Sequence, residues 1–527
     1  MNRSDSIKKL QQQSSWDIII IGGGATGLGI AVDAVSRGYT TLLLEQSDFA
    51  KGTSSRSTKL VHGGVRYLAQ GNIGLVYDAL RERGLMLKNA PHVVKKQSFI
   101  IPCYSTLSRL KYLTGLKLYD WLSGLFSFGA SHFLNKEKTL EHLPELNNDN
   151  LKGGIQYFDG QFDDARLAIN LAQTSAALGG ILLNYFSVKH LVKEEDKVKG
   201  VIAIDIETNC EYEIKAKVVI NATGVFVDDI LQMDAPESRP IVQPSQGIHL
   251  VFDKSFLNSN DAVMIPKTTD GRVLFAVPWH DHVLVGTTDT PLHKHSTEPV
   301  ALNDEINFIL KNIRQYFKQV NKADVLSVFA GLRPLAAPQK ETGNTKEISR
   351  DHKLIVSPSQ LITITGGKWT TYRKMAELTV NKAIEVVGLK NSSCKTKKLH
   401  IHGFTLQPLT GNSLDIYGSD QQAIRILIEE NPSLNEKIIE GFPYLQAQVI
   451  WAVKHEMART VEDVLARRIR LLFLDAKAAM QAATVVAGLM MNELGYDDEW
   501  KHNQVKSFYT LAKNYLVEPS LRHALIN

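Results

Sequence analysis

Cysteine is scarce in this chain of 527 residues, and long apolar runs are missing. The three cysteines, Cys103, Cys210 and Cys394, lie far apart, with no Cys-x-x-Cys pair and no His/Cys cluster at the spacing of metal ligands. This usage is typical of a reducing compartment, and it predicts no metal site. No run of about 18 apolar residues occurs, and the N-terminal segment lacks the apolar core of a secretory signal. We therefore expect a cytoplasmic protein that does not cross a membrane by itself.

A strong excess of charge of one sign is also missing. Lys and Arg number 60 against 55 Asp and Glu, which gives a formal net charge of +5. So small and evenly spread a charge argues against nucleic acid as a partner. Hydrophobic residues make up 44% of the chain and charged residues 22%, as in soluble globular proteins. The length exceeds what one hydrophobic core usually supports, so we expect two or three domains.

The first motif lies close to the N-terminus. A continuous apolar run, WDIIII, precedes the sequence GGGATG, in which Gly22, Gly24 and Gly27 form the pattern G-x-G-x-x-G. A helical pattern and a second apolar strand, TTLLLE, follow, and this strand ends in Glu45. The glycines permit a tight turn and the close approach of a pyrophosphate to the helix N-terminus, while the acidic side chain accepts ribose hydroxyls. The order of these elements predicts a bound adenine dinucleotide.

Two later segments favour FAD over NAD. Residues 53–68, TSSRSTKLVHGGVRYL, form a second loop rich in glycine and hydroxyl groups, placed where it can follow an extended cofactor. Further on, AKVVINATG is another apolar strand, and it ends at Ala222, Thr223 and Gly224. A strand that returns to the cofactor so far downstream is typical of flavoproteins.

Several motifs together resemble the FAD-dependent glycerol-3-phosphate dehydrogenases. These motifs are IIGGGATGLG, TSSRSTKLVHGGVRYL, FDDARL, AGLRPL and GGKWTTYRKMAE. They occur in the order typical of the family, and the resemblance extends from about Trp16 to the C-terminal region. HGGVRYL and GGKWTTYR are far more specific than the glycine motif. The resemblance implies FAD as cofactor and oxidation of sn-glycerol 3-phosphate to dihydroxyacetone phosphate, with a hydride passing from C2 to flavin N5.

The resemblance also implies a set of substrate-binding residues. They are Arg66, Tyr67, His249, Arg333, Arg350 and Lys368. The planar guanidinium fork of arginine matches phosphate oxygens, and several cations in one pocket favour a doubly charged ester over a neutral alcohol. We leave open how the phosphate is shared between them.

Oxidation of a secondary alcohol also requires a group that accepts the hydroxyl proton. His249, in QPSQGIHLVF, is the best candidate because an imidazole with an unperturbed pKa accepts a proton at neutral pH. A histidine inside an apolar strand is more often a core residue, so we also consider Arg333 and Lys368 as catalytic residues that share this role.

The loop at residues 53–68 is expected to lie along the FAD and to contact both ligands. Its residues expected to face the cofactor are Ser54, Ser55, Lys59 and His62, whereas Arg66 and Tyr67 are expected to face the substrate. A third cofactor segment is the strand-to-helix junction at Gly366, Gly367 and Lys368. If the N-terminus of the following helix points at the flavin, its dipole stabilises the negative charge that develops on reduction.

The spacing of the cofactor motifs predicts an α/β protein in three parts. We expect a Rossmann-type FAD-binding domain assembled from discontinuous segments, a substrate domain with a mixed or antiparallel sheet, and a mainly helical C-terminal domain. The first two make up residues 16–389, with FAD-binding segments at about 16–90, 165–235 and 335–389 and substrate-domain segments at about 91–164 and 236–334; residues 399–527 form the third, after a polar linker at 390–398.

The sequence does not determine the environment of two segments. Residues 112–128, YLTGLKLYDWLSGLFSF, are too short and too charged to span a bilayer, and they suit either a buried core helix or a helix in the membrane interface. In the C-terminal part, Arg467, Arg468 and Arg470 lie beside an apolar helix face that runs from Val461 to Ala476. We interpret them as a solvated basic edge, with an anionic membrane or partner surface as the alternative.

The electron acceptor is not determined by these motifs. Family members that reduce quinone are peripheral membrane proteins, so the resemblance favours a membrane quinone and a location at the inner face of the cell membrane. The alternatives are an oxidase that reduces O2, a flavin oxidase of the same fold that acts on amines or amino acids, and a flavin-binding sensor without turnover. A homo-oligomer is compatible with all of them.

Overall fold

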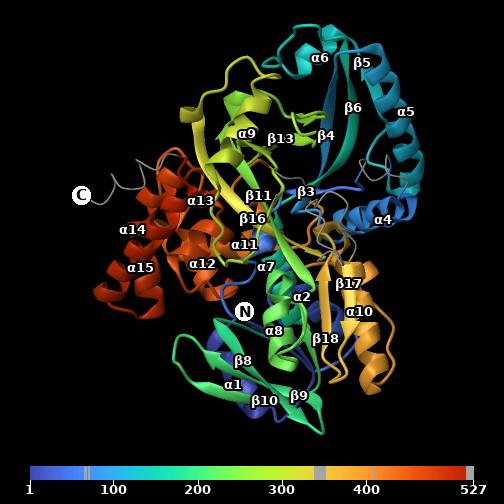
Figure 1. Cartoon of the computed structure of the whole chain (residues 1–527). Coiled ribbons are helices and arrows are strands. Elements are labelled where there is room, and N and C mark those ends of the chain that lie inside the picture. The colour runs from blue at the N-terminus through green and yellow to red at the C-terminus, as the bar shows by residue number, and fades with distance from the viewer. Residues whose placement is uncertain (65–67, 69–71, 337–351, 408–409, 518–527) are drawn as a thin grey trace.

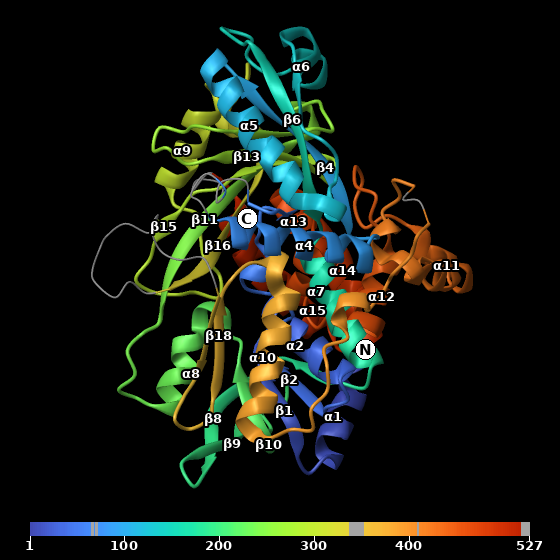
Figure 2. The same ribbon diagram turned by 90° about the vertical axis from the view of Figure 1, so that its right-hand side faces the viewer.

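The computed structural model describes residues 1–64, 68, 72–336, 352–407 and 410–517. Two sheets form the framework of the described chain, one with eight strands and one with ten. In Figure 1 the first sheet lies below, the second lies above, and the C-terminal helices pack at the left. Figure 2 shows the same arrangement from the side.

The first sheet is mostly parallel and has the order β17-β18-β10-β1-β2-β7. Its parallel strands are β1 (Trp16–Ile21), β2 (Thr41–Glu45), β7 (Ile181–Asn184), β10 (Glu211–Asn221) and β18 (Ile362–Gly366). At one edge β17 (His352–Val356) runs antiparallel to β18, and β8 (Phe186–Glu194) and β9 (Lys197–Asp205) extend β10 as an antiparallel hairpin. The sheet is thus assembled from distant parts of the chain.

Both faces of the first sheet are covered. Helices α2 (Ala25–Ser36), α7 (Asp164–Ala177) and α10 (Tyr372–Val387) pack on one face, where Ile18 and Ile20 point. Ile19 and Ile21 point to the other face, which is covered by α1 (Arg3–Gln12), α8 (Val227–Asp234) and the β8–β9 hairpin. Successive side chains of a strand face opposite sides, which explains why β1 is apolar at every one of these positions.

The second sheet is mainly antiparallel, with the order β15-β11-β14-β13-β12-β4-β6-β3; β16 also pairs with β11, and β5 with β6. Its strands are β3 (Leu60–Val61), β4 (Val94–Cys103), β5 (His132–Leu134), β6 (Gly153–Phe162), β11 (Val242–Asp253), β12 (Ala262–Ile265), β13 (Leu274–Trp279), β14 (His282–Gly286), β15 (Thr290–Pro291) and β16 (Val325–Ala336). Around it lie α4 (Ile73–Asn89), α5 (Thr106–Ser123), α6 (Lys136–His142) and α9 (Asn303–Ile313). β3 lies within a segment expected to belong to the cofactor domain, but it pairs with β6 instead.

The C-terminal part is helical, as expected. It contains α11 (Gln421–Glu430), α12 (Gln446–Glu456), α13 (Leu471–Leu474), α14 (Ala476–Leu494) and α15 (Asp498–Ala512). Their core also includes Val251, Leu284 and Phe329 of the second sheet, so the helices pack directly against that sheet. The expected fold class is therefore confirmed: an α/β cofactor domain, a mixed-sheet domain and a helical C-terminal domain.

The interpretation of Arg467, Arg468 and Arg470 as a solvated edge is wrong. All three side chains are buried, with at most 2% of each exposed. The chain does not form one continuous helix here: a π-helical turn spans Asp463–Arg468, and Arg470 adopts a left-handed backbone conformation before α13 begins. The guanidinium groups therefore point into the protein, where buried carboxylates neutralise them.

Of the two alternatives for residues 112–128, a buried core helix does not agree with the structure. α5 buries Leu116 and Tyr119, but Leu110 and Trp121 are 63% and 76% exposed. Among the described residues, no helix is both long and apolar enough to cross a membrane. α5 is therefore a surface helix with an apolar outer face.

Candidate cofactor and substrate site

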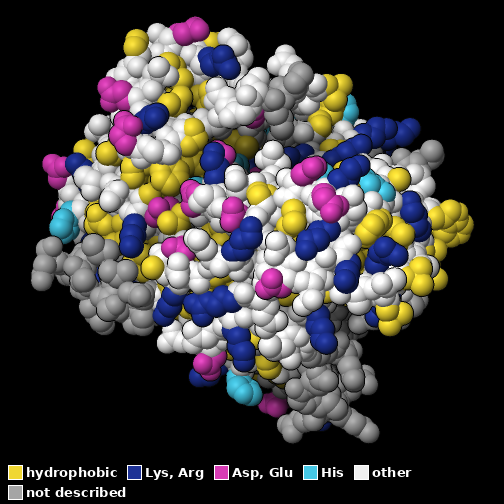
Figure 3. Space-filling model, turned by 90° about the horizontal axis from the view of Figure 1, so that it is seen from above, with side chains coloured by type: hydrophobic (Ala, Val, Ile, Leu, Met, Phe, Trp, Pro, Cys, Tyr) yellow, Lys and Arg dark blue, Asp and Glu magenta, His cyan; other side chains and the backbone are white. Residues whose placement is uncertain are grey.

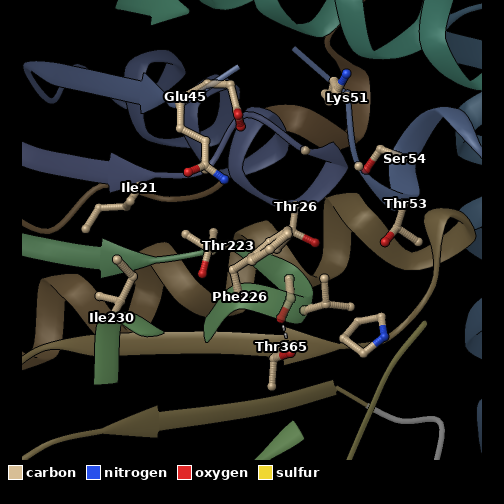
Figure 4. Close-up of a pocket in the computed structure, with 18 of the residues that line it drawn as sticks. Ile21, Thr26, Glu45, Lys51, Thr53, Ser54, Thr223, Phe226, Ile230 and Thr365 are labelled. Carbon is tan, nitrogen blue, oxygen red and sulfur yellow. Dashed lines mark hydrogen bonds between the residues drawn. The ribbon is translucent and has the colours of Figure 1, made fainter. Parts of the chain in front are cut away.

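A cavity of about 390 Å³ lies at the carboxyl ends of β1, β2, β10 and β18. This edge of a parallel sheet is where open α/β proteins bind their ligands. Figure 4 shows side chains from several separate segments converging on the cavity, among them Ile21, Thr26, Glu45, Lys51, Thr53, Ser54, Thr223, Phe226, Ile230 and Thr365.

The glycine turn between β1 and α2 forms one wall of the cavity. Gly22 has φ +110, and a Cβ there would lie 2.7 Å from the carbonyl oxygen of Ala222. A Cβ at Gly27 would overlap the carbonyl oxygen of Gly22. The N-cap of α2, Gly24, has no capping side chain, but Ser54 Oγ accepts a hydrogen bond from Ala25 N at 2.9 Å. The N-terminus of α2, which faces the cavity, suits a pyrophosphate.

Glu45 is fixed at the base of the same wall. Its Oε2 accepts a hydrogen bond from Gly23 N at 2.6 Å, and its Oε1 accepts one from Ser47 N at 2.8 Å. Burial raises the pKa of this carboxyl, although the two backbone donors oppose the shift. Each oxygen retains a lone pair for a ribose hydroxyl, so the position fits the role expected for Glu45.

Two returning segments close the cavity on the other side. Ala222, Thr223 and Gly224 line it, as do Gly367 and Lys368. The indole nitrogen of Trp369 donates to the backbone oxygen of Ser54 at 2.9 Å, which joins the two loops. α10 begins at Tyr372, after a 3-10 turn at Trp369–Thr371.

The loop at residues 53–68 meets the cavity only in part. Ser54 lines it, but Ser55, Lys59 and His62 do not belong to its lining. The side chain of Lys59 is fully buried, and its Nζ donates to Asp164 Oδ2 at 2.7 Å and to the Ser55 carbonyl at 2.8 Å. Burial lowers the pKa of Lys59 to about 7. Ser55, Lys59 and His62 thus lie outside the lining of this cavity, and their expected cofactor contacts stay predictions.

Arg333 lies on β16, opposite Ser245 of β11. Its Nη2 donates to Thr287 Oγ1 and to the carbonyl oxygen of Thr288, both at 3.0 Å, and its Nη1 lies 3.6 Å from Asp289 Oδ1. The side chain is 26% exposed. The guanidinium is thus held by the segment that follows β14, with part of its surface accessible to a ligand.

His249 lies on β11, and its environment differs from the expected one. Its ring stacks on Phe329 with centroids 4.9 Å apart, and its Nε2 lies 2.9 Å from Thr58 Oγ1. Burial, followed by the charges of Lys59 and Arg333, keeps the pKa of the imidazole well below its usual value of 6.5. The expectation of an unperturbed pKa is wrong, and the ring is neutral at physiological pH. A neutral ring binds a hydroxyl by hydrogen bonding but accepts its proton weakly.

Arg66, Tyr67 and Arg350 lie outside the described residues. The structure therefore brings together the cofactor residues at the sheet edge, and it separately places Arg333 near His249 around β11. Lys368 lines the cofactor cavity.

Sequence reasoning missed several residues of the site. Lys51 and Phe226 line the cavity, and Thr287 accepts a hydrogen bond from Arg333. Lys51 comes six residues after Glu45, the end of strand β2, and this short distance in the sequence could have indicated that it lies near the cofactor. Nothing local marks Phe226 or Thr287, because their roles depend on segments that are distant in the sequence.

Comparisons with known proteins agree with this geometry. A family model described as FAD dependent oxidoreductase matches residues 17–372, and one described as the C-terminal domain of alpha-glycerophosphate oxidase matches residues 363–501. The mitochondrial glycerol-3-phosphate dehydrogenase of Rattus norvegicus is 39% identical, over 96% of this chain and 74% of the relative. That of Schizosaccharomyces pombe is 38% identical, over 94% and 87%.

A solved structure is also similar over nearly its whole length. It is a glycerol-3-phosphate dehydrogenase from Bacillus halodurans complexed with FAD, with 31% identity, a TM-score of 0.81 and 98% of both chains covered. The fold, the glycine turn and the cavity define an FAD-dependent oxidoreductase, and FAD is its cofactor. Within that class, the chain belongs to the glycerol-3-phosphate dehydrogenase family.

Proposed function

We propose that this flavoenzyme, which oxidises glycerol 3-phosphate as its family does, converts the sn isomer to dihydroxyacetone phosphate and passes the electrons to a membrane quinone. Bound FAD supplies the hydride acceptor. The observation that carries the acceptor proposal is the apolar outer face of α5, which suits the membrane interface where a quinone is dissolved.

Four exposed apolar side chains lie on the outer side of α5, with the exposed Lys111 and Thr114 between them. Leu107, Leu110, Leu118 and Trp121 are spaced by three, eight and three residues, which places them on one side of the helix, and they are 78%, 63%, 43% and 76% exposed. The opposite side carries Leu116, which is buried. An apolar face this exposed indicates a contact with a membrane or another protein.

Two other polar side chains of α5, Lys117 and Asp120, bind the neighbouring loop. Lys117 Nζ donates to the carbonyl oxygen of Ser131 at 2.5 Å, and Asp120 Oδ2 accepts from the backbone N and the hydroxyl of Ser131 at 2.8 and 2.6 Å. These bonds tie the flank of the helix to the loop that precedes β5. They fix the rotation of α5, so that the leucines and Trp121 face outward.

The neighbouring helix α4 adds to this surface. Ile73 and Tyr77 are 52% and 53% exposed, and Arg81 and Lys88 are also exposed. Figure 3 shows hydrophobic side chains beside Lys and Arg side chains along the right-hand edge, the side on which α4 and α5 lie in Figure 1. A surface that combines Trp, Tyr and Leu with basic groups is typical of helices that lie in the interface of an anionic membrane. We propose that this surface attaches the protein to the inner face of the cell membrane.

Substrate binding is proposed for Arg333 and Lys368, together with Arg66, Tyr67 and Arg350, which lie outside the described residues. The charge and partial exposure of Arg333 support this role. His249 is proposed to orient the substrate hydroxyl through its neutral ring, and Thr58 supports it as the hydrogen-bond partner of Nε2. Lys368 lines the cofactor cavity, which supports a position between cofactor and substrate.

Membrane attachment is tested by sedimentation with vesicles that contain an anionic phospholipid. The wild type is expected to bind, and a double variant, Leu110→Ser with Trp121→Ser, is expected to bind about tenfold less because each substitution removes apolar area from the contact. Leu406→Ser is the matched control, since Leu406 is 81% exposed and lies outside α5. Vesicle binding that is equal in the double variant and the wild type would show that α5 is not the contact.

The acceptor is tested by stopped-flow mixing. The enzyme is first reduced anaerobically with glycerol 3-phosphate and then mixed with a short-chain quinone or with air-saturated buffer. Faster reoxidation by the quinone supports the proposal. O2 is the second candidate, favoured by the match of residues 363–501 to the C-terminal domain of an oxidase. Faster reoxidation by air, with peroxide released, would make that candidate correct.

A further inference from the structure

We propose that Thr287 is a positioning residue for Arg333 and that it sets the affinity for the phosphorylated substrate. The inference rests on the substrate-binding role proposed above for Arg333. It is carried by the hydrogen bond from Arg333 Nη2 to Thr287 Oγ1 at 3.0 Å.

An arginine side chain has many rotamers, and its planar fork binds a phosphate well only when the fork has a defined orientation. Thr287 Oγ1 and the Thr288 carbonyl both accept from Nη2 of Arg333. At the other terminal nitrogen, Nη1 lies 3.6 Å from Asp289 Oδ1. Contacts at both terminal nitrogens fix the plane of the guanidinium before a ligand binds, which lowers the entropy lost on binding.

The segment that carries Thr287 is itself held by a buried carboxylate. Glu305, at the start of α9, is 5% exposed, and its Oε1 accepts from Thr288 Oγ1 at 2.9 Å. Its Oε2 accepts from Gln246 Nε2 at 2.8 Å. Ser245, the residue paired with Arg333 across the strands, donates its hydroxyl to Asp289. The chain directly after Thr287 is therefore fixed, so its hydroxyl is a rigid acceptor for Arg333.

Gly247 also constrains the place where Arg333 and Thr287 meet. A Cβ at Gly247 would overlap the guanidinium of Arg333 and would lie 2.5 Å from Thr287 Oγ1. The absence of a side chain at Gly247 thus leaves the space in which Arg333 and Thr287 meet. Gly247→Ala is therefore expected to displace the guanidinium of Arg333, the hydroxyl of Thr287, or both.

The test compares steady-state KM and kcat for glycerol 3-phosphate, with a saturating artificial electron acceptor, in matched variants. Thr287→Val keeps the shape of the side chain and removes the acceptor, and it is expected to raise KM about tenfold, with a change in kcat of less than about threefold. Thr287→Ser restores the hydroxyl and is expected to return KM to within about twofold of the wild type. Anaerobic titration of flavin bleaching is expected to give the same order of substrate affinities.

Thr290→Val is the matched control. Thr290 Oγ1 donates to Glu305 Oε1 at 2.7 Å, so the variant removes a hydroxyl from the same segment and leaves the bond between Thr287 and Arg333 intact. Its KM is expected to stay within about twofold of the wild type. A rise in KM equal to that of Thr287→Val would show general loosening of the segment and would overturn the proposal.

Other outcomes are equally decisive. An unchanged KM in a folded, flavin-loaded Thr287→Val protein overturns the positioning role. If Thr287→Val does not fold, Thr287→Ala provides the second measurement, because it removes the same acceptor: a raised KM supports the proposal, and an unchanged KM overturns it. Arg333→Ala separates this inference from the proposal on which it rests, because an unchanged KM in that variant would remove Arg333 itself from the substrate site.

Discussion

Arg468 and Asp48 form a bidentate ion pair in the interior of the protein, with Nη1 to Oδ2 at 2.8 Å and Nη2 to Oδ1 at 2.9 Å. Both side chains are fully buried. Arg467 Nε donates to the same carboxylate at 2.5 Å. Asp48 lies just after the strand that ends in Glu45. These ion pairs therefore join the C-terminal helical part to the loop that borders the cofactor cavity.

Asp48→Asn is expected to destabilise the protein by about 3 to 5 kcal/mol, because it leaves two buried guanidinium groups without their shared carboxylate. Chemical denaturation of wild type and variant measures this difference. Glu493→Gln is a suitable control, because Glu493 pairs with the exposed Lys454 at 3.4 Å and a surface pair contributes little. Equal unfolding midpoints for Asp48→Asn and the wild type would mean that the ion pair does not stabilise the fold.

The same ion pair implies that the stability of the protein depends on pH in the acid range. The two arginines lower the pKa of Asp48 from its usual 3.8 to about 2, against the effect of burial. The stabilisation is fully present above about pH 5 and is lost as pH falls toward 2, since the unfolded chain takes up the proton first. Stability curves of wild type and Asp48→Asn, measured across this range, are expected to converge as the pH decreases.

Glu462→Gln is expected to weaken FAD binding several-fold, although Glu462 is not among the described residues that line the cavity. Its carboxylate accepts from Lys51 Nζ at 2.5 and 2.6 Å, and Lys51 does line the cavity. Burial opposes ionisation of Glu462, yet Arg467 and Lys51 lower its pKa to about 2, so the charge that holds Lys51 is present at neutral pH. Fluorescence of released FAD measures the dissociation constant, and a constant equal to that of the wild type would disprove the link.

These networks show where sequence reasoning reaches its limit. The glycine turn and β1 were predictable because a few adjacent residues determine a tight turn and a strand buried on both faces. Arg467 and Arg468 were misplaced because their burial depends on Asp48, about 420 residues away in the chain. A local pattern of arginines beside apolar residues is the same for a solvated helix edge and for a buried ion-pair network.

α5 illustrates a second limit. Its sequence is apolar on two opposite sides, and periodicity alone does not indicate which side the fold covers. The bonds from Lys117 and Asp120 to Ser131 decide the question, and they depend on the path of the loop before β5. His249 is similar: its position in a strand was predictable, but its low pKa comes from burial by residues of other segments.

Lys59→Met provides a test of the buried ammonium group. Burial lowers the pKa of Lys59 from its usual 10.5 to about 7, although Asp164 opposes this shift. Between these values the unfolded chain binds more protons than the folded one, so this group makes the wild type more stable as pH rises from 7 to 10.5. The stability of the wild type relative to Lys59→Met is therefore expected to rise over this range and to level off below pH 7. A difference that is constant with pH would show that Lys59 stays charged.

The most direct test of the substrate site is anaerobic bleaching of the bound flavin by glycerol 3-phosphate. The wild type is expected to bleach, whereas amines and amino acids are expected to leave the flavin oxidised, because the partly exposed charge of Arg333 suits a phosphate. Arg333→Ala and Arg66→Ala are expected to retain FAD and to need about a hundredfold more substrate for half bleaching, since each loses a charge-assisted contact. Half bleaching at the concentration that the wild type requires would remove that arginine from the phosphate site. Loss of flavin in either variant would instead place the residue at the cofactor.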